Sequence, residues 1–160
     1  MRVVVWITEA GWEAAVDAVA LLAQAEVTLL HIAGAATEAP GGALSGLLGR
    51  RREAVEARLA GLDEQAGERL LDAAAQRLGR PAELSRRTGR PEREAVEAAR
   101  GADVLIVSRA TLEPGPRSLG HAARFVVDHA PCRVLLVWPG EPPPDRPPPP
   151  PHHPPPHRRP

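Results

Sequence analysis

The sequence predicts a doubly wound α/β fold, in which helices cover both faces of a parallel β-sheet. Short apolar runs rich in β-branched residues recur along the chain, as at residues 3–7 and 103–108. Such runs are typical of strands buried on both faces. Longer amphipathic segments separate them and predict helices. This alternation over residues 1–138 predicts five parallel strands joined by right-handed crossovers.

Length and charge restrict the functional classes. The 160 residues correspond to about one domain, and the 20 basic and 20 acidic residues cancel. We therefore expect no nucleic-acid partner and no attraction to a membrane surface. No apolar run approaches the roughly 20 residues of a membrane span, and the N-terminus lacks the apolar core of a signal peptide, so we expect a cytoplasmic protein. Cys132 lies in an apolar strand and predicts a buried, inert thiol.

The first third of the chain predicts two strands and the helix between them. Residues 3–7 form the first strand and residues 26–32 the second, before Gly34 and the run Pro40-Gly41-Gly42 break regular structure. The helix spans residues 9–25. Its apolar positions recur at spacings of three and four: Trp12, Val16, Val19 and Ala23.

Two further helices are predicted before the third strand. Residues 43–52 are predicted to form a short helix that ends in three arginines, Arg50–Arg52. These arginines could bind a phosphate or an acidic partner, but the interpretation we favour is a solvated helix face. A long helix follows over residues 53–78, in which Gly61 and Gly67 each cost about 1 kcal/mol relative to alanine. Its predicted apolar stripe is Val55, Leu59, Leu62, Ala66, Leu70 and Ala74.

The second half predicts a polar edge strand at residues 83–88 and then a helix at 92–100, with Pro91 in its first turn. Residues 103–108 form the next strand. Pro114 and Pro116 around a glycine forbid regular structure in the loop that follows. Ser118 is then predicted to cap a helix over residues 119–129, which ends before a last buried strand at 132–137.

From Pro139 onward prolines dominate, and this composition predicts a disordered tail over residues 139–160 that samples polyproline II. Such a tail can dock on aromatic grooves of a partner protein. Its histidines, His152, His153 and His157, offer ligands for Ni²⁺ or Zn²⁺, although a solubilising tail that binds no metal is the interpretation we favour.

The C-terminal part of the domain resembles the end of a universal stress protein domain. The run His129-Ala130-Pro131-Cys132 before the last strand carries this resemblance, together with Gly120. Two further features resemble those common in the family: the turn Gly89-Arg90-Pro91 and the pair His31-Ile32 at the end of the second strand. The resemblance covers residues 1–138 and implies a flavodoxin-like, adenine-nucleotide-α-hydrolase-like sheet with strand order 3-2-1-4-5. It also implies a homodimer that forms through the strand Arg133 to Val137.

The ligand crevice of such a sheet lies at the carboxyl ends of the first and fourth strands, where the strand order reverses. Family members that bind ATP carry there the signature G-x2-G-x9-G-[S/T]. Anchored on Gly120, it requires glycines at 107 and 110 and a hydroxyl residue at 121. The chain has Val107, Ala110 and His121, and it has Thr8 where those relatives have Asp after the first strand.

The resemblance and these departures together imply a weak or lost ATP site. Glycine matters there because backbone N–H groups cradle phosphate only where no Cβ blocks the approach. Arg109 and Arg117 can replace lost backbone contacts with side-chain charge. We expect no cofactor, with weak ATP binding as the alternative. The candidate nucleotide cleft comprises Thr8, Ile32, Val107, Ser108, Arg109, Ala110, Gly120, His121 and Ala122.

No catalytic constellation appears in the sequence, so we expect no enzyme. The acidic residues are spread over helix faces, and Ser108 and Ser118 lack the G-x-S-x-G elbow of a hydrolase. The expected function is a dimeric, stress-type regulatory protein with a weak or lost ATP site. Two alternatives remain: a stress protein that binds ATP or AMP, and an interaction module that acts through its Pro-rich tail.

Overall fold

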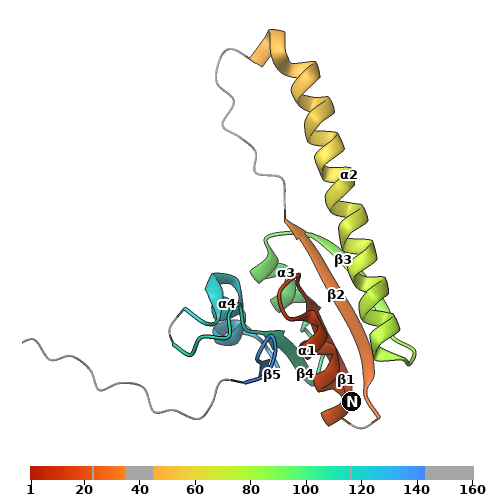
Figure 1. Cartoon of the computed structure of the whole chain (residues 1–160), viewed down its shortest axis with the longest axis vertical. Helices are drawn as coiled ribbons and strands as arrows, with labels where there is room; N and C mark the ends of the chain where they lie inside the picture. Colours follow the sequence, from red (N-terminus) through yellow and green to blue (C-terminus); the bar gives the residue numbers. More distant parts are fainter. Residues whose placement is uncertain (23, 35–44, 116, 143–160) are drawn as a thin grey trace, which may run out of the picture.

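The computed structural model describes residues 1–22, 24–34, 45–115 and 117–142, and gives only the backbone for 45–57, 59 and 60. They form one five-stranded sheet with the order β3-β2-β1-β4-β5, and all paired strands are parallel (Figure 1). The predicted fold class and strand order are confirmed. The side chains of the three arginines at 50–52 lie outside the described part of the chain. So do the tail residues 143–160, which include the three histidines proposed as metal ligands.

The strands at the centre of the sheet are the buried ones. β1 (Arg2–Ile7) lies between β2 (Glu26–Gly34) and β4 (Val104–Ser108), and every residue of β4 is buried. β3 (Glu83–Gly89) and β5 (Arg133–Val137) are the edges, as predicted for β3 from its polarity. The edge position of β5 was predicted by the strand order and is confirmed, whereas the prediction that its residues are buried is wrong for the single chain, in which they are only partly buried.

The first helix is shorter than predicted. α1 spans Trp12–Asp17 and is followed by η1, a 3₁₀ turn over Ala18–Leu21. Gly11 precedes it with φ +78°, a left-handed conformation that a continuous helix from residue 9 excludes. The final turn tightens, with Leu22 N–H donating to the carbonyl of Val19 at 2.9 Å, as helix C-termini commonly do.

α2 is one continuous helix, Ser45–Leu78, where the sequence predicted two. Its N-terminal half extends past the end of β2, and its C-terminal half lies beside the sheet (Figure 1). The predicted apolar stripe is partly wrong: Ala74 is buried, but Ala66 is exposed and Leu62 is 55% exposed. The buried face instead runs through Gly67, Leu71 and Ala74, at spacings of four and three.

The other face of the sheet is covered by α3 (Pro91–Ala98) and α4 (Gly120–His129). Val3 and Val5 point into the core shared with α1 and α2, whereas Val4 and Trp6 point into the core shared with α3 and α4. The predicted Ser118 cap is wrong, because Leu119 occupies the N-cap of α4 and no side chain caps it. Ser118 is used in the preceding loop instead.

Candidate functional site

The carboxyl ends of β1 and β4 meet at the predicted crevice, but their hydroxyl groups are already engaged. The Thr8 hydroxyl donates to the carbonyl of Ala10 at 2.9 Å. Ser108 is buried, and its hydroxyl donates to the carbonyl of Arg109 at 3.1 Å. Each of these side chains therefore satisfies a local loop carbonyl, and neither leaves its proton free for a ligand.

The segment after β5 lies against the turn between β1 and α1. Gly11 is buried, and a Cβ at this position would collide with Ser108 Oγ and lie 2.7 Å from the Cβ of Pro139. Gly11 therefore packs closely against both Ser108 and Pro139, near the point where the strand order reverses. This contact extends the packed part of the chain past residue 138.

The loop after β4 is organised around Ser118, which is 1% exposed. Its hydroxyl donates to the carbonyl of Gly115 at 2.8 Å and accepts from Nη1 of Arg109 at 2.6 Å. The Ser118 carbonyl accepts from the backbone N–H of Ala110 at 2.7 Å. The Arg109 guanidinium also lies 4.3 Å from the ring centroid of Trp138, a cation–π contact that fixes its position.

The structure gathers part of the predicted cleft and separates the rest. Ala110 and Gly120 face each other, since a Cβ on Gly120 (φ +68°) would lie 3.4 Å from the Cβ of Ala110. Val107 is 1% exposed and packs, with Ala122, into the core under α3 and α4. His121 is exposed in the first turn of α4.

Ile32 lies apart from the others and lines a hollow of about 490 Å³ between the end of β2 and α2. The His31 ring lies in the same hollow, with Nδ1 3.4 Å from the carbonyl oxygen of Ile7. A Cβ on Gly67 would come within 2.6 Å of His31 Nε2, so this helical glycine makes room for the ring. Acidic and basic side chains are mixed around the rim: Glu9, Asp63 and Arg69.

Sequence reasoning missed Gly11, Trp138 and Pro139 and misassigned Ser118. The available signals were a glycine shortly after the first strand and a Trp-Pro pair immediately after the last one. Neither signal indicates which surface the segment covers. That depends on the path of the chain in three dimensions.

The remaining chemistry of the described residues is modest. Burial raises the pKa of the Cys132 thiol, which is half-buried, and this disfavours the reactive thiolate. Among described residues no group of three His, Cys, Asp or Glu side chains is arranged to hold a metal ion. Within that same part of the chain, no helix has the length and apolarity needed to cross a membrane.

Comparison with known proteins identifies the family. The model of the universal stress protein family matches residues 1–137. The chain belongs to this family. No curated protein sequence matches it. The resemblance inferred from Gly120 and the run before β5 is thereby confirmed.

Solved structures of universal stress proteins share the fold at low sequence identity. UspA from Lactobacillus plantarum superimposes with a TM-score of 0.59 at 19% identity, covering 86% of this chain and 97% of that one. A universal stress protein from Archaeoglobus fulgidus gives 0.54 at 19% identity, covering 85% and 97%. An Arabidopsis thaliana family protein with AMP bound gives 0.52 at 19% identity, covering 86% and 90%.

Proposed function

We propose that this protein is a non-enzymatic, regulatory universal stress protein whose nucleotide crevice is closed by its own chain. The observation that carries the proposal is the close approach of both Pro139 and Ser108 to Gly11, near the ends of β1 and β4. A nucleotide in this crevice has to displace Pro139. The residues present therefore do not fit ATP in the manner of the family signature.

The loop after β4 supports the same proposal. Phosphate binding in the family relies on open glycine backbone, and here Arg109 is held by Ser118 and Trp138 across that loop. Freeing it for a phosphate costs a charge-assisted hydrogen bond, on the order of 1.5 to 3 kcal/mol. A micromolar affinity corresponds to about 8 kcal/mol, so this loss and the displacement of Pro139 remove much of it.

Calorimetric titration with ATP and Mg²⁺ tests the proposal. We expect no dissociation constant tighter than about 1 mM, which corresponds to about 4 kcal/mol, and no release of phosphate. A matched chain that ends at Val137 lacks the covering segment and should bind more tightly than the full chain. A low micromolar constant for the full chain would overturn the proposal.

The alternative is nucleotide binding, which the AMP-bound Arabidopsis structure favours, because it covers 86% of this chain. In that case Arg109 and the exposed Arg117 are the cations nearest to the signature loop. Replacing both, Arg109→Ala with Arg117→Ala, should then abolish AMP binding. If the crevice is closed, the same pair of changes alters only stability.

We also propose that the protein is a homodimer that forms through β5. In the described part of the chain no strand lies beside the outer edge of β5, and its apolar residues are only partly buried: Val134, Leu135, Leu136 and Val137. An open apolar edge is prone to pair with a second copy.

Light scattering at tens of micromolar tests this interface. We expect the mass of two chains for the wild type and of one chain for Leu136→Lys, because a charge on an edge strand blocks edge pairing. Leu84→Lys on the opposite edge, where Leu84 is 46% exposed, is the control and should remain a dimer. A wild-type monomer contradicts the proposal.

A further inference from the structure

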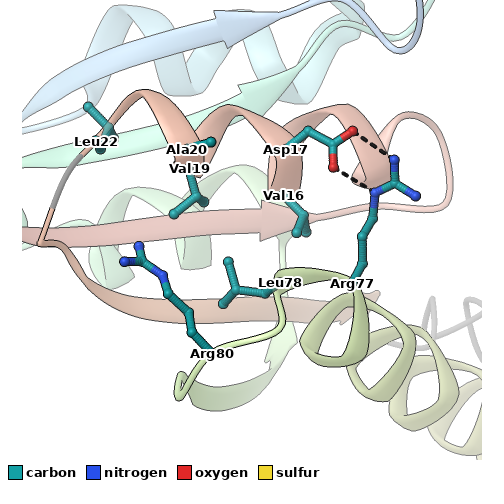
Figure 2. A pocket seen from close by; sticks show the side chains of 8 residues that line it. All are labelled: Val16, Asp17, Val19, Ala20, Leu22, Arg77, Leu78 and Arg80. Carbon is teal, nitrogen blue, oxygen red and sulfur yellow. Dashed lines mark hydrogen bonds and ion pairs between the residues drawn. The ribbon is translucent and has the colours of Figure 1, made fainter.

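A second hollow, of about 530 Å³, lies between the α1–η1 segment and the C-terminal end of α2, and it shares no residue with the crevice. Its volume falls in the range of about 300–1,000 Å³ typical of small-molecule sites. Figure 2 shows Val16 and Val19 on one side and Leu78 between two arginines on the other. The lining residues are Val16, Asp17, Val19, Ala20, Leu22, Arg77, Leu78 and Arg80.

One side of the hollow is closed by an ion pair. The two carboxylate oxygens of Asp17 accept from Nε and Nη2 of Arg77, each at 2.7 Å (Figure 2). This hydrogen bonding lowers the pKa of Asp17, so the carboxylate stays ionised. A bidentate pair of this kind satisfies the carboxylate. Asp17 is therefore committed to Arg77.

Arg80 is the unpaired cation of the hollow. Its Nη2 is the one buried side-chain nitrogen or oxygen without a hydrogen-bond partner in the described part of the chain. In Figure 2 the guanidinium reaches from the segment after α2 toward Val19 and the 3₁₀ turn. Arg80 as a whole is partly exposed, so the rest of its guanidinium reaches solvent, but the buried Nη2 is left as an unused donor on a group that keeps its charge. Such groups are rare in native structures and call for a partner.

We propose that this hollow binds a small monocarboxylate with a short aliphatic chain. The lining carries two guanidinium groups, Arg77 and Arg80, and one carboxylate, Asp17, which leaves a net charge of +1 for one anionic oxygen group. The ligand carboxylate accepts from Nη2 of Arg80. Its aliphatic body covers Leu22 and Leu78, the partly exposed leucines of the lining, whose apolar surface disfavours a fully hydrated anion, while the buried Val16 and Val19 form the floor behind them. This site is independent of the closed nucleotide crevice.

The test is titration of the full chain with sodium octanoate, followed by calorimetry and by backbone amide NMR shifts. We expect saturable binding with shifts confined to α1, η1 and the end of α2. Octanol has the same body without charge and should bind at least about tenfold more weakly, since a charge-assisted hydrogen bond contributes about 1.5 to 3 kcal/mol. Inorganic phosphate should not compete. Equal binding of octanol and octanoate overturns the proposal.

Variants locate the site. Arg80→Met removes a partly buried guanidinium that has no partner in the described part of the chain, so the fold should remain intact, and it should weaken octanoate at least about tenfold. Arg93→Met removes an exposed arginine of α3 and, as the control of equal charge change, should bind like the wild type. Ala20→Trp, at an exposed lining position, should block the hollow without touching Arg80. Unchanged binding by Arg80→Met or by Ala20→Trp refutes the assignment.

Discussion

Gly11 decides whether the β1–α1 turn, the end of β4 and the segment after β5 can meet. Its φ of +78° and the collision of an added Cβ with Ser108 Oγ both exclude a side chain. Gly11→Ala should lower the free energy of unfolding by about 2–5 kcal/mol, combining about 1–2 for the left-handed backbone with about 1–3 for overpacking. Urea denaturation measures this loss.

Gly79 separates the two causes. It also has a positive φ, +64°, but a Cβ there has nothing within 4 Å. Gly79→Ala should therefore cost only the backbone part, about 1–2 kcal/mol. Equal losses for Gly11→Ala and Gly79→Ala would show that Pro139 does not press on the turn in solution.

The ion pair of Asp17 with Arg77 makes a small contribution that depends on pH. The Asp17 pKa lies below its ordinary 3.8, because Arg77 donates hydrogen bonds to the carboxylate and attracts it, while partial burial acts in the opposite sense. A carboxyl group with a depressed folded pKa contributes stability that is complete above the unfolded pKa. This contribution disappears as the pH falls through the lower folded pKa.

Comparing the free energies of unfolding of the wild type and Asp17→Asn at several pH values measures the contribution of this ion pair. The stability difference should be constant at pH values above 3.8 and should shrink toward zero below it. We expect a small difference, since the two side chains are 44% and 56% exposed. A difference that grows on acidification would contradict the pairing.

α2 contains a glycine that helix propensity alone does not explain. Gly67 lies against the His31 ring, and an added Cβ would come within 2.5 Å of its Cδ2. Gly67→Ala gains about 1 kcal/mol of helix propensity but loses about 1–3 through overpacking, so it should be neutral to destabilising. In a chain that already carries His31→Ala, the same change should stabilise by about 1 kcal/mol.

Gly61 is the matched control for this cycle, because nothing lies within 4 Å of a Cβ placed on it. Gly61→Ala should stabilise the wild type and the His31→Ala chain equally, by about 1 kcal/mol. Thermal or urea denaturation of the six chains completes the measurement. If Gly67→Ala stabilises the wild type as much as Gly61→Ala does, the ring does not occupy this place.

The elements differ in how far local sequence determines them. β1 and β4 are continuous apolar runs. Runs of this kind are typical of strands buried on both faces, so the sequence alone predicts these two strands. The burial of α2 was harder to predict because Leu62 and Ala66 fit an apolar stripe, yet the helix turns Gly67 and Leu71 to the sheet. Helix periodicity cannot show that His31 needs a glycine opposite it.

The candidate site likewise contains features that the sequence predicts and features that it does not. Topology alone places Ser108, Arg109 and Ala110 at the reversal of strand order, and the family signature adds Gly120. Side-chain direction is not given by the signature, and Val107 points into the core under α3 and α4. The approach of Pro139 to Gly11 depends on where the chain goes after β5. No local pattern encodes that path.

The packed part of the molecule extends beyond the last strand. Trp138 carries the Arg109 guanidinium on its ring, Pro139 lies on Gly11, and a Cβ on Gly140 would lie 3.6 Å from Leu112. These residues join the end of the chain to the β1–α1 turn and to the loop after β4. The packed part of the chain therefore includes the three residues after β5.

Two truncations test this boundary. A chain that ends at Gly140 keeps these contacts and loses mainly prolines, which bury little apolar surface, so its melting temperature should equal that of the full chain. A chain that ends at Val137 loses the cation–π contact, worth about 0.5–2 kcal/mol, and the apolar contacts of Trp138 and Pro139. For a domain of this size each 1 kcal/mol lowers the melting temperature by roughly 2–4 °C, so a drop of several degrees is expected. Equal melting of the two truncated chains would mean that the segment after β5 does not close the crevice, and the explanation for a lost nucleotide site would then rest on the substituted signature positions alone.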